Sequence, residues 1–569
     1  MNKKNFIKNQ FVFNIFFLIL LSICILFIFF NINKGLDFTD ESYSLLRSLY
    51  PELEIGKITY FGYLNKFLLD FFNQNLSLLK IFTICLLSVS FINLSFTFNK
   101  LIKIFFNYQY NYIFLLVISF AGIVNFYSNW RLFPNYDFYN LIGVINFLSG
   151  LILFFLKKKF KYNLNIIYAL SLISIGLLIS LISKPSTFII LSILALLTPF
   201  FIKDERISVF INCLATILIS FLFFLIFLKM INISYQEYIT DLIFGSDIKK
   251  LQDPRYDIKF LLLGSIKQLL FFFYTKSYVF IAVLAILYIE KKFIQSKGYL
   301  SIIFSSLLLL VFKSPLFAIT CLGLHIIIAE YNFLKKNFFK VIYLPFVFFI
   351  CYFGFSIGTN TNFVVHLKKF DILPFLLFFY LLNLFKFNYR FKEVILNTVL
   401  IGTICILVTL QFNQGIKKPY RLHDSVLKQT KKINIKPFNS NIFIDKSSHS
   451  FLTNIQDIFF NNNWKSKDSL IELSGRYPVF NVILEARYVS KPWYLGGYDG
   501  STNFVKSFLK ETDTNLIKNS WIITSDYKFG ISEQVLEELN LNLNKDYIYV
   551  DKFYDKINDR LFRVYKPNN

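Results

Sequence analysis

Cysteine is scarce in this sequence, and its placement excludes several classes of site. The 569 residues include six cysteines. All lie within apolar runs, and none lies in the polar C-terminal region: Cys24, Cys85, Cys213, Cys321, Cys351 and Cys405. This pattern provides neither a disulfide framework nor the spacing of zinc ligands. The C-terminal region also lacks a Gly-rich phosphate loop, and the chain has no repeat of fixed period. These absences argue against redox chemistry and a structural metal site.

Acidic residues are also few, with 35 Asp and Glu against 60 Lys and Arg, for a formal net charge of +25. In a soluble chain such a charge would suggest a nucleic-acid partner. Here Lys and Arg concentrate in short segments between apolar runs, where they orient membrane spans. The hydrophobic share of 55% and the aromatic share of 20% are typical of a membrane protein. We therefore expect no nucleic-acid partner.

Long apolar runs dominate the first 411 residues. A helix needs about twenty residues to cross roughly 30 Å of hydrocarbon, and this length predicts about thirteen spans. The first span follows a basic flank and lacks a small-residue cleavage site, so we interpret it as a retained helix rather than a signal peptide. The predicted spans are 11–31, 76–98, 111–128, 139–156, 164–182, 186–202, 207–231, 264–289, 299–312, 314–330, 339–357, 371–386 and 393–411.

The basic loops predict the orientation of these spans, because positively charged loops remain in the cytoplasm. With the N-terminus inside, alternate loops such as "KKKFKYN" and "EYNFLKKNFFK" are rich in Lys. The remaining loops, and everything after about Gln411, then lie outside. We therefore expect an integral protein of a bacterial inner (plasma) membrane, with a cytoplasmic N-terminus.

The character of the chain changes after residue 411, where apolar runs become short and Asn, Ser and acidic residues become common. "NIFID", "WIITS" and "YIYVD" read as strands, and "STNFVKSFLKETD" and "SEQVLEELNL" read as helices. The predicted fold is a multi-span α-helical membrane domain, 1–411, followed by a soluble extracytoplasmic α/β domain, 412–569.

An acidic cluster follows the first span directly. "GLDFTDESYSLLR" contains Asp37, Asp40 and Glu41. Adjacent carboxylates beside a membrane can bind a divalent cation, act as a general base toward a hydroxyl, or hydrogen-bond a sugar. They can also simply be solvated. The segment from Glu52 to Asn75 carries apolar residues at helical spacing, which predicts one or two amphipathic helices along the outer interface.

The order of first span, "DFTDESYSL" and amphipathic segment resembles the start of the membrane-embedded GT-C glycosyltransferases. That class includes protein O-mannosyltransferases and the aminoarabinose transferase of lipid A. The resemblance extends over the span pattern of residues 11–411. It implies transfer of a sugar from a polyprenyl-phosphate donor, within membrane lipid, to an acceptor hydroxyl on a glycan, lipid or protein at the outer face.

The resemblance also assigns roles to the acidic cluster. Asp40 becomes the candidate general base that helps to deprotonate the acceptor hydroxyl, with Glu41 as its neighbour in binding or positioning. Asp37 is the next candidate for the base. If the enzyme uses a divalent metal ion, Asp40 and Glu41 are its expected ligands.

The lipid phosphate that leaves in such a reaction needs cationic partners, which we seek in the outer loops. Arg131 lies in "NWRLFPNYDFYN", although an arginine there could also snorkel to lipid head groups. Lys184 lies in the short turn "LISKPSTF", at the membrane boundary, and its Lys-Pro pair resembles positions seen in the family. The predicted substrate-binding residues are Arg131, Tyr136, Asp137, Lys184, Arg255 and His366.

Three other functions are alternatives to the glycosyltransferase. A transporter predicts charged residues in the middle of spans or helices broken at matching points, and the sequence shows neither. An outer-leaflet polysaccharide polymerase or ligase also uses lipid-linked sugars, but its large outer region usually lies between spans. In a noncatalytic membrane scaffold the C-terminal domain would bind a partner and the acidic cluster would be incidental.

Overall fold

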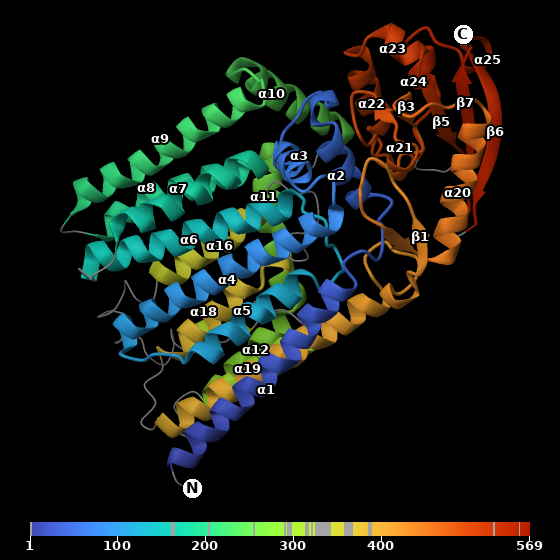
Figure 1. Cartoon of the computed structure of the whole chain (residues 1–569). Coiled ribbons are helices and arrows are strands. Elements are labelled where there is room, and N and C mark those ends of the chain that lie inside the picture. Colours follow the sequence, from blue (N-terminus) through green and yellow to red (C-terminus); the bar gives the residue numbers. More distant parts are fainter. Residues whose placement is uncertain are drawn as a thin grey trace.

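The computed structural model combines a large helical bundle with an α/β region at one end (Figure 1). Two predicted site residues, Arg255 and His366, lie outside the described part of the chain. The structure describes all residues except 1–2, 161–164, 203–204, 254–256, 290–291, 293–298, 313–317, 320–321, 325–342, 358–367, 385–389, 527–529, 557 and 569.

The bundle is built from apolar helices of different lengths. Within the described ranges, six helices are long and apolar enough to cross a membrane, and they support an integral membrane protein: Phe11–Phe30, Leu76–Phe106, Tyr136–Lys158, Ile166–Ser183, Arg206–Met230 and Thr398–Lys417. The bundle helices are α1 (Lys3–Phe30), α4 (Leu76–Phe106), α5 (Tyr112–Phe126), α6 (Tyr136–Phe160), α7 (Ile166–Ser183), α8 (Pro185–Leu197), α9 (Arg206–Met230), α11 (Ile258–Thr275), α12 (Ser277–Ile289), α13 (Tyr299–Phe312), α16 (Leu344–Ser356), α18 (Ile372–Leu382) and α19 (Arg390–Lys417).

The predicted count of thirteen spans stays a prediction, because several described helices are shorter than a bilayer crossing. Those at 112–126, 185–201, 344–356 and 372–382 are apolar but have fewer than 18 residues. The predicted span 264–289 is interrupted at Lys276, where α11 ends and α12 begins. Most of the predicted span 314–330 lies outside the described residues.

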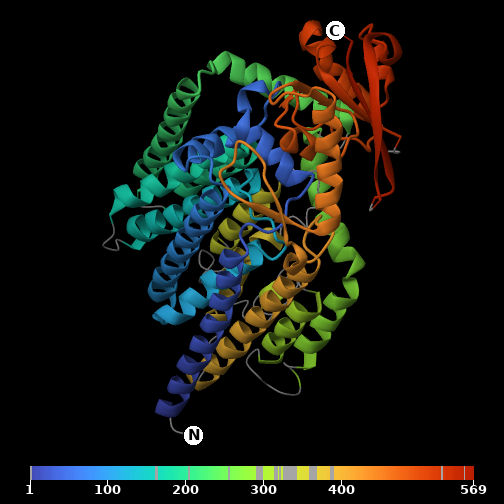
Figure 2. The ribbon, with the colours of Figure 1, turned by 45° about the vertical axis from the view of Figure 1, so that its right-hand side comes forward.

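Three of the connections predicted to share one side, those between α1 and α4, α5 and α6, and α7 and α8, meet at the same end of the bundle. Trp130 Nε1 donates to the Lys34 carbonyl at 2.9 Å, and the Tyr60 amide donates to the Ile182 carbonyl at 2.8 Å. The N-terminus lies at the opposite end, and α1 runs beside α19 toward the α/β region (Figure 2). The candidate acids therefore lie at the end of the bundle that carries the C-terminal region.

A juxtamembrane segment between α1 and α4 covers this end. It contains α2 (Asp40–Leu49), the short 3-10 helix η1 (Pro51–Leu53) and α3 (Phe61–Phe71). The prediction of a helix within 52–75 is confirmed by α3, which is too short to span a membrane. Phe61 and Leu69 are buried, whereas the side chains of Phe67 and Phe71 are exposed. The exposed rings suit the predicted position at a lipid interface.

The C-terminal region is an α/β structure, as predicted. Its main sheet has the order β4-β3-β5-β7-β6, with β3 parallel to β4 and β5, and β7 antiparallel to β5 and β6. Its strands are β3 (Ser469–Glu472), β4 (Arg487–Tyr488), β5 (Trp521–Ser525), β6 (Tyr547–Asp555) and β7 (Arg560–Pro567), and a separate antiparallel pair consists of β1 (Lys431–Ile433) and β2 (Ile442–Ile444). The helices are α20 (Lys446–Asn461), α21 (Val479–Ile483), α22 (Ser501–Lys510), α23 (Thr514–Lys518), α24 (Gln534–Glu537) and α25 (Leu543–Asp546).

The three predicted strands correspond to β2, β5 and β6, and the first predicted helix corresponds to α22. The second predicted helix, 532–541, is reduced to the single turn of α24. The predicted boundary at 411 falls within α19, which continues to Lys417. The membrane helix therefore leads directly into the segment that precedes the α/β region.

The C-terminal region shares a hydrophobic core with the juxtamembrane segment. Leu36, Phe38 and Leu45 belong to the same buried cluster as Ile444 and Phe480. The Val479 amide donates to the Phe38 carbonyl at 3.2 Å. Because Phe38 lies between Asp37 and Asp40, this packing fixes the acidic loop between the bundle and the α/β region.

A buried ionic cluster makes a second connection between the two parts. Arg47 Nε lies 2.5 Å from Glu54 Oε2, and Lys491 Nζ donates to Glu54 Oε1 at 2.9 Å. Lys57 lies 3.5 Å from Asp241 of α10 (Tyr235–Gln252). Burial alone would raise the pKa of Glu54, but the charges of Arg47 and Lys491 outweigh it and lower the pKa to about 2.

Candidate functional site

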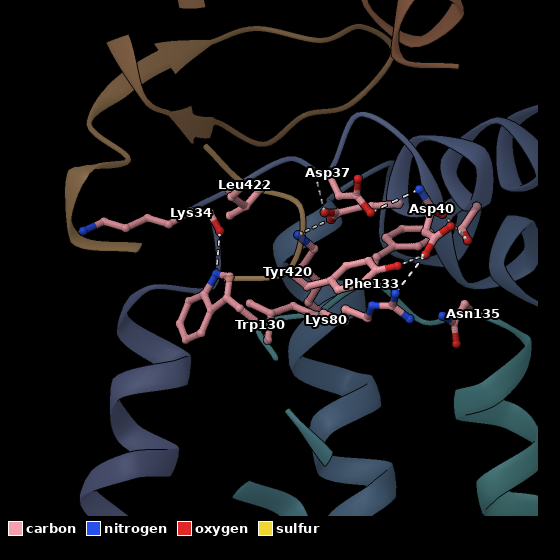
Figure 3. A pocket seen from close by; sticks show the side chains of 14 residues that line it. Lys34, Asp37, Asp40, Lys80, Trp130, Phe133, Asn135, Tyr420 and Leu422 are labelled. Carbon is pink, nitrogen blue, oxygen red and sulfur yellow. Dashed lines mark hydrogen bonds and ion pairs between the residues drawn. The ribbon is translucent and has the colours of Figure 1, made fainter. Parts of the chain in front are cut away.

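Asp40 is the first residue of α2, and both of its carboxylate oxygens accept hydrogen bonds. Oδ2 accepts from Arg131 Nη2 at 2.9 Å and from the Tyr420 hydroxyl at 3.1 Å (Figure 3). Oδ1 accepts from Arg421 Nη1 at 3.0 Å. The side chain is 33% exposed, so a ligand can reach it. The predicted acid and the predicted cation Arg131 are therefore in direct contact.

Asp37 holds the first turn of α2. Its Oδ1 accepts from the Thr39 amide at 2.9 Å, and its Oδ2 accepts from the Asp40 amide at 3.1 Å. These bonds satisfy amide groups that have no partner within the helix. Burial, with a smaller effect from Asp40, raises the pKa of Asp37 to about 6. Asp37 lines the same pocket as Asp40, but its contacts suit a residue that positions Asp40.

Glu41 faces a buried lysine that the sequence analysis did not identify. Lys80, in the second turn of α4, has its Nζ 2.9 Å from Glu41 Oε1, and its side chain is 5% exposed. Glu41 Oε2 also accepts from the Asp37 amide at 3.2 Å. A lone lysine near the start of an apolar run was a usable signal, because ionisable residues within spans commonly serve function.

Arg131 contacts both Asp40 and Tyr420, a residue from a distant part of the chain. Its guanidinium carbon lies 3.4 Å from the ring centroid of Tyr420, which follows α19. A Cβ at Gly415 would lie 1.6 Å from the Ser128 carbonyl oxygen, so only glycine permits this approach of α19 to the α5–α6 loop. The Tyr420 amide then donates to the Asn129 carbonyl at 3.1 Å. This packing places the aromatic ring over Arg131.

Two adjacent pockets meet at Arg131. The pocket around Asp40 is lined by Lys34, Gly35, Asp37, Asp40, Glu41, Ser44, Lys80, Trp130, Arg131, Leu132, Phe133, Asn135, Tyr420 and Leu422. The neighbouring pocket is lined by Asp137, Lys369, Asn129 and several aromatic residues as well as Arg131. Asp137 is buried and forms an ion pair with Lys369. Asp137 therefore lines the neighbouring pocket, which shares Arg131 with the Asp40 pocket.

The structure does not bring two other predicted residues into these pockets. Lys184 is buried, donates from Nζ to the Phe355 carbonyl at 2.7 Å, and lines neither pocket. It connects the α7–α8 turn to α16, which is a structural role. The Tyr136 ring packs beside Phe61, with 6.4 Å between the ring centroids, and also lies outside both linings.

The acids that were candidate metal ligands, Asp40 and Glu41, are both paired with basic side chains. Asp40 is engaged by two arginines, and Glu41 by Lys80. Within the part of the chain that the structure describes, no group of three or more His, Cys, Asp and Glu side chains is placed to hold a metal. In this arrangement a divalent cation would have to displace basic side chains from both acids. The site as arranged therefore suits an anionic ligand better than a metal.

Comparison with known proteins does not indicate a family or a function for this chain. No protein-family model, no curated protein and no solved structure matches this chain.

Proposed function

We propose that this protein is a membrane glycosyltransferase that moves a sugar from a polyprenyl-phosphate donor to an acceptor hydroxyl. One observation carries the proposal. A partly exposed carboxylate, Asp40, lies in a pocket at the end of an apolar helical bundle, in contact with Arg131 and Arg421 and beside Lys80. A base next to several cations suits a reaction in which a hydroxyl loses a proton and a phosphate leaves.

The bonds that change follow from this assignment. The acceptor oxygen bonds to the anomeric carbon of the sugar, and the bond from that carbon to the phosphate oxygen breaks. The lipid phosphate leaves with the electron pair, while the hydroxyl proton moves to Asp40. Arg131 and Arg421 bind the phosphate, since guanidinium groups match phosphate oxygens in charge and geometry. Stacking on Tyr420 holds Arg131 in place before the donor arrives.

Orientation in the membrane is part of the same proposal. We place the N-terminus in the cytoplasm and the α/β region outside a bacterial inner membrane, with thirteen spans between them. Support comes from α6, which begins at Tyr136, next to the pocket residue Asp137, and ends at Phe160, just after the basic residues Lys157, Lys158 and Lys159. Basic residues at the end away from the site agree with the rule that positively charged segments stay in the cytoplasm.

The proposed transfer does not require a divalent metal, because the arginines supply the positive charge that the leaving phosphate needs. The acceptor is a hydroxyl on a glycan, a lipid or a protein. The test is reconstitution of the purified chain in vesicles that contain lipid-linked sugar extracted from bacterial membranes. We expect protein-dependent release of polyprenyl phosphate when acceptor is present, whereas a noncatalytic scaffold would give none.

A further inference from the structure

We propose that Arg421 changes partners during the reaction, leaving Asp40 to bind the phosphate of the donor. The segment after α19 would then determine when Asp40 can act as a base. This inference rests on the proposed glycosyltransferase function and adds an order of events: donor binding precedes activation of the base.

The first argument is the engagement of Asp40. Arg421 occupies Oδ1, and Arg131 and Tyr420 occupy Oδ2. A carboxylate has two oxygens with about four acceptor sites, and charge-assisted hydrogen bonds are the strongest it makes. To accept a proton from a hydroxyl, Asp40 must give up part of this stabilisation. Departure of one of its two arginines would open one of the carboxylate oxygens to the hydroxyl.

The second argument identifies Arg421 as the arginine that moves. Arg131 is 25% exposed and stacks closely on Tyr420, and its neighbour Trp130 is hydrogen-bonded to the Lys34 carbonyl. Arg421 is 34% exposed, and its guanidinium carbon lies farther from the ring of Tyr420, at 4.8 Å. It also has a φ of +55° in an irregular segment, a conformation that costs energy for a side chain with a Cβ. Arg421 also donates to the Thr39 hydroxyl and would give up that bond together with the one to Asp40. Arg131 would instead give up the closer stacking on Tyr420, and the more exposed Arg421 is better placed to reach an incoming ligand.

The third argument concerns the ligand that can draw Arg421 away. It must carry negative charge and offer several acceptor oxygens, as a phosphate ester does. Within the described residues the Asp40 pocket is lined by Lys34, Lys80 and Arg131 as well as by the three acids. Lys80 is already paired with Glu41. An incoming phosphate would therefore compete with Asp40 for Arg421, and winning that competition frees Oδ1.

The experiment measures equilibrium binding of radiolabelled polyprenyl phosphate and of uncharged polyprenol to the purified full chain in detergent. The variants are Arg421→Ala and Arg421→Lys. Arg563→Ala is the matched control, because Arg563 is 35% exposed and is also paired with an aspartate, Asp526, on the α/β region. We expect Arg421→Ala to bind polyprenyl phosphate about 10- to 100-fold more weakly, with polyprenol binding unchanged. Arg421→Lys should be intermediate, and Arg563→Ala should match the wild type.

A double-mutant cycle with Asp40→Ala tests the exchange itself. Without its competitor Arg421 should bind the phosphate more readily, so Asp40→Ala should raise the affinity for polyprenyl phosphate. That gain should be clearly smaller in the Arg421→Ala background. Equal binding by Arg421→Ala and wild type, or strictly additive effects in the cycle, would overturn the exchange alone. Failure of the wild type to bind polyprenyl phosphate would overturn both the exchange and the proposed function.

Discussion

Arg131 and Tyr420 form a cation–π pair, with 3.4 Å between the guanidinium carbon and the ring centroid, and both side chains donate to the same oxygen of Asp40. The pair joins the α5–α6 loop to the segment after α19, so the site depends on both halves of the chain.

This pair predicts different effects for two substitutions of Tyr420. Tyr420→Phe keeps the stacking and loses the hydroxyl, so donor binding should stay within a few-fold of the wild type. Tyr420→Ala removes the stacking, which contributes about 0.5–2 kcal/mol, and donor binding should weaken by roughly 2- to 30-fold. Binding of polyprenyl phosphate measures both. If the two variants bound equally well, the stacking would have no role in holding Arg131.

The ion pair between Lys80 and Glu41 predicts a coupled loss of stability. Lys80→Met leaves Glu41 without its cation in a largely buried position, so the free energy of unfolding should fall by about 3–5 kcal/mol. Lys80→Met with Glu41→Gln should recover part of the loss. Thermal unfolding in detergent measures both variants. The control is Lys66→Met, because Lys66 pairs with Glu52 at the surface and such pairs contribute no more than about 1 kcal/mol.

If Lys80→Met lowered the free energy of unfolding as little as Lys66→Met, the buried pair of Lys80 and Glu41 would not stabilise the acidic cluster. The double variant provides a second test of the pair. An additive result, with no recovery in the double variant, would show that Lys80 and Glu41 do not interact in the folded protein.

Glu54 predicts how stability depends on pH. Its pKa is lowered to about 2 by Arg47 and Lys491 against the effect of burial, whereas in the unfolded chain it is near 4.3. A carboxyl with a lowered pKa stabilises the fold above its unfolded value and loses this contribution as pH falls. We expect the loss between about pH 4.5 and pH 2. Glu54→Gln should remove this part of the pH dependence and lower stability at pH 7, because Arg47 and Lys491 then stay buried without their counter-charge.

Limited proteolysis together with thermal unfolding at several pH values checks the Glu54 prediction. The cluster connects the juxtamembrane segment to Lys491 of the C-terminal region, so cleavage between the two parts should increase in Glu54→Gln. If Glu54→Gln were as stable as the wild type at pH 7, the ionic cluster would not hold the two parts together.

The proposed orientation predicts which residues a membrane-impermeant thiol reagent can reach. In single-cysteine variants of intact cells, Ser450→Cys should be labelled from outside, because Ser450 is exposed on α20. Lys159→Cys, in the basic run at the C-terminal end of α6, should be labelled only after the membrane is permeabilised. The reverse labelling pattern would show that the topology is inverted and would contradict a reaction at the outer face.

Local patterns in the sequence predicted the elements better than the contacts between them. The strands at 442–444, 521–525 and 547–555 follow from their β-branched and aromatic residues. The orientation rule predicted that Asp40 and Arg131 lie on the same side of the membrane, but it did not predict that they are in contact. Such rules say which loops share a side and nothing about distances within that side.

The residues that sequence analysis missed depend on packing between distant segments. Tyr420 and Arg421 reach Asp40 because Gly415 lets α19 approach the Ser128 carbonyl, and no local pattern encodes that approach. Lys184 was predicted to bind phosphate from its place in a short turn. The end of α16 packs against that turn and offers the Phe355 carbonyl instead.

The most direct test of the central claim is sugar transfer by Asp40→Asn in reconstituted vesicles, with lipid-linked donor and with chelator added in a parallel sample. General-base help typically contributes about 10²- to 10⁴-fold to rate, so the account predicts a loss of turnover of that order. Polyprenyl phosphate should bind to this variant at least as tightly as to the wild type, and the chelator should have no effect on the wild type. Near-normal turnover by Asp40→Asn would contradict the assignment of Asp40 as the base.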